Sequence, residues 1–190
     1  MSSKSKTYVK NLTLSAMFLA IGLVLPFFTG QIRTIGNMLL PMHLPVFLCG
    51  LICGWQYGAA VGLILPVFRS LLFSMPPLPL AIVMAFELAT YGGVAGFLYG
   101  RSKWKCVLAL YRSMLVAMLA GRVVWAIGRT VLAGQNPKFG FGLEVFLTSG
   151  FVEAIPGIIL QLTLIPVIMV ALDRTGMVPF SKRSSAVKEN

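Results

Sequence analysis

The sequence predicts an all-α, polytopic membrane protein, and three observations lead to this fold class. Hydrophobic residues make up 57% of the 190 residues, charged residues only 11%, and the mean hydropathy is +0.87. A soluble domain carries about 25% charged residues, so the composition excludes an ordinary soluble protein. Uncharged runs such as residues 11–32 and 154–172 are long enough to cross a bilayer as helices, which takes roughly 20 apolar residues.

Six transmembrane helices are predicted from the apolar runs and the turns between them. The predicted spans cover residues 12–28, 42–53, 58–73, 80–99, 107–132 and 144–172. The stretch 34–68 carries no charge unless His43 is protonated, and it is too long for one crossing, so we place a turn at residues 54–57. Three prolines within residues 76–79 predict a stiff loop before the fourth span. Residues 1–175 are expected to form one six-helix domain, and residues 176–190 a polar cytoplasmic tail.

The distribution of basic residues predicts which side of the membrane holds the termini. Six crossings place both termini on one side, and eleven of the sixteen Lys and Arg residues lie before residue 11, within residues 101–112 or after residue 173. Because lysine and arginine are enriched in cytoplasmic segments, we predict that both termini are cytoplasmic. The net charge of +11 is therefore explained by membrane topology, and no nucleic-acid partner is expected.

Ionisable side chains inside the spans are the candidate functional residues, because a charge at bilayer depth is costly. Spacing places Arg122, Trp125 and Arg129 on one helix face and pairs Glu87 with Tyr91 at i, i+4. Charged groups beside aromatic rings are typical of a pocket for a small, polar, ring-containing molecule. The predicted substrate-binding residues are Asn37, His43, Arg69, Glu87, Tyr91, Arg122, Trp125, Arg129 and Glu153.

These residues also have a purely structural interpretation, which the sequence leaves open. Glu87 and Glu153 could serve only to neutralise arginines of neighbouring helices, and His43 could be a hydrogen-bonded structural residue. Small residues four positions apart form three ridges, at residues 16 and 20, at 54, 58 and 62, and at 92, 96 and 100. Such ridges allow close helix approach, either inside the bundle or against another protein.

Common catalytic and nucleotide-binding motifs are absent from the sequence. It has no Gly-x-x-x-x-Gly-Lys-Ser/Thr loop, no His-Glu-x-x-His and no Gly-x-Ser-x-Gly, and it contains one histidine. We therefore expect neither an enzyme nor a metal or cofactor site.

Residues 5–175 resemble the S-components, the substrate-binding subunits of energy-coupling factor (ECF) vitamin transporters. The resemblance rests on the basic N-terminus, on Ala16-Met-Phe-Leu-Ala20, on the segment 42–50 leading to Gly-Trp-Gln-Tyr-Gly at 54–58, and on the positive loop after the fourth span. It implies high-affinity binding of a vitamin or related micronutrient at the outer face of a prokaryotic plasma membrane. The ligand contacts would come from the outer region where the residues named above lie.

The resemblance also implies the partners and the route of import. Ala16 and Ala20 would dock onto a membrane coupling protein, which is driven by two cytoplasmic ATPase subunits, so import would depend on ATP supplied by the partners. The ligand stays open among pyridoxine-like, riboflavin-like, queuosine-precursor, tryptophan-like and pantothenate-like molecules. The alternatives are a membrane helix-packing or interaction protein without transport, and a stand-alone secondary carrier.

Overall fold

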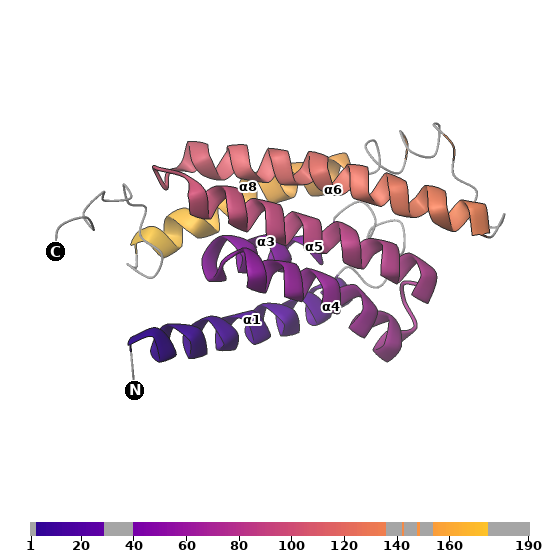
Figure 1. Cartoon of the computed structure of the whole chain (residues 1–190), viewed down its shortest axis with the longest axis horizontal. Coiled ribbons are helices and arrows are strands. Elements are labelled where there is room, and N and C mark those ends of the chain that lie inside the picture. Colours follow the sequence, from indigo (N-terminus) through magenta and orange to yellow (C-terminus); the bar gives the residue numbers. More distant parts are fainter. Residues whose placement is uncertain (1–2, 29–39, 136–141, 143–147, 149–153, 175–190) are drawn as a thin grey trace.

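The computed structural model describes residues 3–28, 40–135, 142, 148 and 154–174, and these residues form a bundle of helices (Figure 1). The helices are α1 (Ser3–Phe28), α3 (His43–Cys53), α4 (Trp55–Phe73), α5 (Leu78–Arg101), α6 (Val107–Gln135) and α8 (Ile155–Arg174). The described residues contain no strand. The prediction of an all-α fold is therefore confirmed for this part of the chain.

Five of these helices are long and apolar enough to cross a membrane, and α3 is the exception. The span predicted at 42–53 is a helix of 11 residues, about 16 Å long at 1.5 Å per residue, and ten of its residues are buried. Neighbouring helices surround α3. Because it is so short, it reaches only part of the way through the bundle. Five described helices have membrane-spanning length, and the six crossings stay a prediction.

Several predicted helix ends differ from the observed ones. The predicted turn at residues 54–57 is shorter in the structure and consists of Gly54 alone. Its φ of 106° is a backbone conformation that glycine adopts readily, and α4 begins directly at Trp55. The predicted proline loop ends at Pro77, and Pro79 lies in the first turn of α5, where its missing N–H costs nothing. The first part of the predicted span 144–172, apart from Thr148, lies outside the described residues through 153.

Helix α5 lies at the centre of the bundle and packs against α3, α4 and α6 (Figure 1). The glycine ridges explain how closely these backbones approach. A Cβ atom added to Gly92 of α5 would collide with the backbone of Gly58 in α4, and one added to Gly96 would collide with the backbone of Gly50 in α3. These glycines therefore serve packing inside the bundle.

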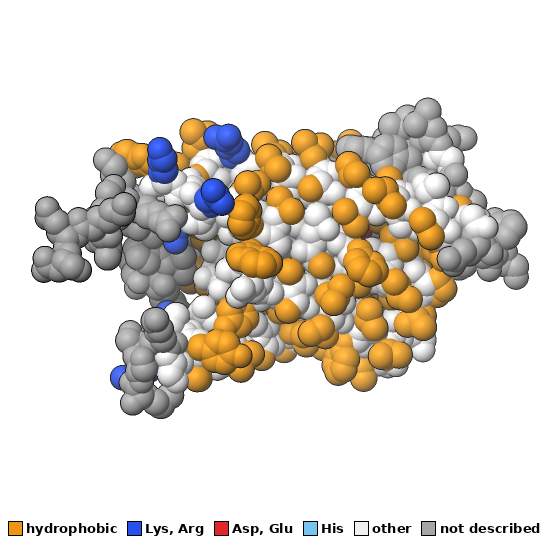
Figure 2. Space-filling model, in the orientation of Figure 1, with side chains coloured by type: hydrophobic (Ala, Val, Ile, Leu, Met, Phe, Trp, Pro, Cys, Tyr) orange, Lys and Arg blue, Asp and Glu red, His pale blue; other side chains and the backbone are white. Residues whose placement is uncertain are grey.

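The first turn of α1 and the last turn of α8 lie at the same end of the bundle (Figure 1). We call this the basic end, because exposed lysines and arginines gather there beside the apolar surface (Figure 2). Its described basic residues are Lys6, Lys10, Arg101, Lys103, Lys105, Arg112 and Arg174. This grouping agrees with the predicted topology, while the assignment of the basic end to the cytoplasm stays a prediction.

Candidate functional site

Four of the predicted site residues meet inside the bundle, and we call them the buried cluster: His43, Glu87, Tyr91 and Arg122. They come from α3, α5 and α6, and all four are at least nine-tenths buried. The Tyr91 hydroxyl donates a hydrogen bond of 2.9 Å to Glu87 Oε1, as their i, i+4 spacing predicts. Arg122 Nη1 donates a hydrogen bond of 3.1 Å to the same oxygen and forms an ion pair with it.

His43 completes the cluster without making a hydrogen bond to it. Its Nε2 atom lies 3.9 Å from Glu87 Oε1, which is beyond hydrogen-bond distance, and its ring centroid lies 5.1 Å from that of Tyr91. The side chain is 3% exposed, and neither ring nitrogen has a hydrogen-bond partner among the described residues. Buried polar atoms normally have a hydrogen-bond partner, so a role in packing alone does not explain this imidazole.

The described contacts of Glu87 with Arg122 use one of the two carboxylate oxygens. All three neighbours of the Glu87 carboxylate approach Oε1, and no described residue makes a hydrogen bond to Oε2. Arg122 has five N–H donors, of which it uses one in the described part of the chain. The cluster therefore presents an anionic acceptor, cationic donors and a free imidazole within one site.

Aromatic rings adjoin the cluster on two sides. Phe47 lies with its ring centroid 5.2 Å from that of Tyr91, a contact that the sequence analysis did not identify. The Arg122 and Arg129 guanidinium carbons each lie 5.9 Å from the centroid of the Trp125 ring. The predicted common face of these three residues on α6 is thus confirmed, and Trp125 connects Arg129 to the cluster.

Three other predicted residues are placed elsewhere or fall outside the description. Arg69 joins α4 to α1 and makes no contact with the buried cluster; its Nη1 donates to the Leu23 carbonyl oxygen at 3.1 Å. Asn37 and Glu153 lie outside the described residues.

Gln161 of α8 is 2% exposed, and its Nε2 has no hydrogen-bond partner among the described residues, so it is a further buried amide donor.

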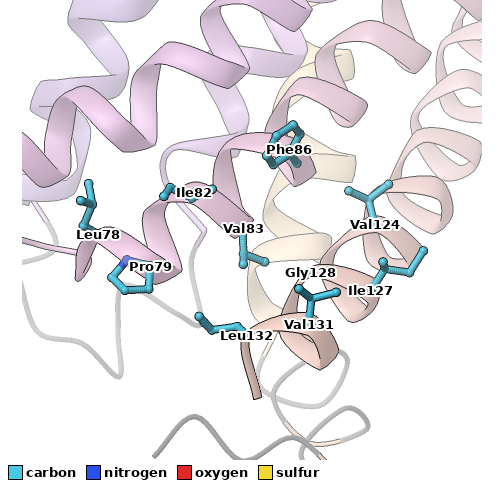
Figure 3. Close-up of a pocket in the computed structure, with 10 residues that line it drawn as sticks. All are labelled: Leu78, Pro79, Ile82, Val83, Phe86, Val124, Ile127, Gly128, Val131 and Leu132. Carbon is cyan, nitrogen blue, oxygen red and sulfur yellow. The ribbon is translucent and has the colours of Figure 1, made fainter. Parts of the chain in front are cut away.

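A separate groove of about 740 Å³ lies between the beginning of α5 and the last turns of α6 (Figure 3). It is lined by Leu78, Pro79, Ile82, Val83, Phe86, Val124, Ile127, Gly128, Val131 and Leu132. None of the predicted substrate-binding residues is among these. Many of its side chains, such as Phe86 and Ile127, are exposed on the outside of the bundle, where a membrane protein meets lipid.

The small-residue ridges differ in what they face. The side chains of Ala16 and Ala20 are exposed on α1, whereas the glycines of α4 and α5 that carry contacts face other helices. Exposed apolar neighbours of the two alanines include Met17 and Ile21. The alanine ridge is therefore available to another membrane protein, and the glycine ridges around Gly58 and Gly92 are not.

A family model described as ECF transporter, substrate-specific component, matches residues 10–169. The chain belongs to this family. Neither the search of curated proteins nor the search of solved structures found a match. S-components are transporter subunits and not enzymes; they bind a substrate for import together with an energy-coupling module. This S-component is accordingly a multi-pass plasma membrane protein, in agreement with its apolar helices.

Proposed function

We propose that this S-component binds a water-soluble vitamin or related micronutrient in the buried cluster and delivers it inward with an ATP-driven coupling module. The observation that carries the proposal is His43, a buried imidazole beside the Glu87–Arg122 pair whose two ring nitrogens have no hydrogen-bond partner in the described part of the chain. A bound ligand would supply the missing hydrogen bonds. The family membership supports a small-molecule substrate.

The chemistry of the cluster suggests what the ligand offers. Glu87 Oε2 accepts hydrogen bonds, whereas the remaining N–H groups of Arg122 donate them. The charges of these two side chains cancel, and burying an uncompensated charge is costly. We therefore expect the bound ligand to have no net charge and to carry a hydrogen-bond donor and an acceptor close together. It should also contain a ring that stacks on Tyr91 or Trp125.

A screen with a matched pair of variants tests this proposal. Purified protein is titrated calorimetrically with riboflavin, pyridoxine, pantothenate and tryptophan. We expect one compound to bind with a Kd of about 1 nM, equivalent to about −12 kcal/mol, because hydrogen bonds hold Glu87, Tyr91 and Arg122 in place before a ligand arrives. His43→Leu should weaken that binding at least tenfold.

The same variant distinguishes a ligand-binding histidine from a structural one. A histidine side chain that stabilises the fold would cost stability when replaced. The His43 ring makes no hydrogen bond to the described residues, so His43→Leu should keep or raise the melting temperature. Tyr99→Phe is the matched control, because Tyr99 is also 2% exposed with an unpaired hydroxyl, yet lies at the basic end. It should leave ligand affinity unchanged. Loss of stability in His43→Leu without any loss of affinity would contradict the proposal.

We further propose that the coupling protein docks on the exposed ridge of Ala16 and Ala20. Small side chains allow the backbone of a partner helix to approach closely, and this ridge lies on the exposed side of α1. The docking face is thus separated from the buried cluster, which comes from α3, α5 and α6. Binding and docking should therefore be separable by mutation.

A further inference from the structure

Arg69, which the sequence predicts as a substrate-binding residue, contacts α1 from its position on α4. Its side chain is 5% exposed, and its Nη1 donates a hydrogen bond of 3.1 Å to the Leu23 carbonyl oxygen of α1. Its guanidinium carbon lies 5.5 Å from the ring centroid of Phe27 and 5.6 Å from that of Phe73. These two rings contact each other edge to face, with centroids 4.9 Å apart. We call this set of four residues the α1 clasp.

The clasp holds a charge without a carboxylate among its described contacts. A guanidinium at membrane depth needs hydrogen bonds and aromatic faces to replace water, and here two of the three contacts come from α1. Arg69 is therefore favourably placed only while the end of α1 lies against α4. Pro26 removes one N–H from the same part of α1, so this helix end depends more on contacts with its neighbours.

Helix α1 makes further polar contacts near the basic end. Near the basic end, Asn11 Nδ2 donates to the Cys53 carbonyl oxygen at 3.3 Å, and the Cys49 thiol donates to Ser15 Oγ at 3.5 Å. At the opposite end the clasp supplies a polar contact between α1 and α4. Ala16 and Ala20 lie on α1 between these two attachments.

We infer that Arg69 is a positioning residue, which holds α1 so that the Ala16–Ala20 ridge meets the coupling protein in the correct orientation. This inference rests on the proposed function for the docking step, but the position of α1 can be measured without a ligand or a partner. Replacing Arg69 should therefore release the end of α1 and weaken docking, while ligand affinity is kept.

Spin labels on α1 and α6 measure the release directly. Val24 and Val131 are exposed, at 53% and 57%, and both lie towards the end opposite the basic residues, so each is replaced by cysteine and labelled. Cys49 and Cys53 are buried, and Cys106 is replaced by serine. In Arg69→Met we expect a broader distribution of distances between the two labels than in the parent protein. Arg101→Met is the matched control, because Arg101 lies 5.8 Å from the Phe97 ring at the basic end, and it should leave the distribution unchanged.

Two functional readouts complete the test. Capture of the purified coupling module should weaken about tenfold in Arg69→Met, and Arg69→Lys should restore it only in part, because an ammonium lacks the planar face that stacks between two rings. The calorimetric titration with the four compounds named above should give an unchanged Kd. An unchanged label distribution with unchanged capture would overturn the inference, and so would a loss of affinity with an unchanged distribution, which would place Arg69 in the binding site. If the parent protein binds no compound and captures no module, the proposed function fails, while the distance measurement still decides whether the clasp holds α1.

Discussion

Replacing one side chain of the Glu87–Arg122 pair should destabilise the protein, whereas replacing both should not. Glu87→Gln keeps the shape of the side chain but leaves the Arg122 guanidinium without its carboxylate at 3.1 Å, in a site where Arg122 is 7% exposed. Removing one partner of a buried pair costs about 3–5 kcal/mol. Glutamine still accepts hydrogen bonds from Tyr91 and Arg122. We therefore expect the free energy of unfolding to fall by about 3 kcal/mol, the lower end of this range.

The assay is thermal unfolding of the purified protein in detergent micelles. A loss of about 3 kcal/mol corresponds to a fall in Tm of about 6–12 °C for a chain of this size. Arg122→Met should cost a similar amount, because it leaves the buried Glu87 carboxyl group without its guanidinium partner. The double variant Glu87→Gln, Arg122→Met removes both charges and should lie within about 1–2 kcal/mol of the parent protein, so the two changes are strongly non-additive.

Arg112→Met provides the control on the same helix. Arg112 is exposed near the basic end of α6, and its replacement should change stability by no more than about 0.5 kcal/mol. The reasoning is refuted if Glu87→Gln and Arg122→Met are each as mild as this control. It is also refuted if the double variant loses as much as the two single variants together, since the two side chains would then not interact.

Three further outcomes are expected. Ala16→Leu or Ala20→Leu should abolish capture of the coupling module while ligand affinity is kept, because the larger side chain prevents close helix approach. Pull-down with the purified module measures the capture. Loss of both capture and ligand affinity would indicate misfolding instead. Gly92→Ala should lower the yield of folded protein in size-exclusion chromatography, because its Cβ would collide with the Gly58 backbone, whereas Gly100→Ala, with open space around it, should not. Tyr91→Phe should cost about 1 kcal/mol in the same unfolding assay through the lost hydrogen bond to Glu87, and a larger cost would indicate further partners.

The local part of the site could be predicted from the sequence, because helical spacing alone determines it. Residues three and four positions apart meet on a helix surface, and this gave the contact of Tyr91 with Glu87 and the positions of both arginines around Trp125. The membrane class followed from the length and composition of the apolar runs. The family assignment agreed with both.

Contacts between helices could not be predicted in this way. The partner of Glu87 is 35 residues away on α6, and the partner of Arg69 is 46 residues away on α1, so no periodicity within one helix reveals them. For the same reason Arg69 was grouped with the substrate-binding residues, although its neighbour Phe73 at i+4 was a signal of the aromatic contact. The small-residue ridges looked alike in the sequence, and only packing separates the buried glycines from the exposed alanines.

The length of α3 depends on tertiary structure as well. An apolar run of about twelve residues is compatible with a short span or with a buried helix, and composition does not distinguish them. The surrounding helices bury ten of its eleven residues, and this places His43 at the start of a helix inside the bundle. The position of the only histidine in the chain is therefore a consequence of packing that the sequence pattern leaves open.

The most direct test of the central claim is native mass spectrometry of the parent protein and His43→Leu, purified side by side from the same host. The claim is that the buried cluster holds a guest molecule, with His43 supplying part of its hydrogen bonding. It predicts that the parent protein retains one small molecule through purification and that His43→Leu, although equally well folded, retains much less of it. Equal retention by both proteins, or a ligand that survives the loss of His43 and of the Glu87–Arg122 pair, would contradict the claim.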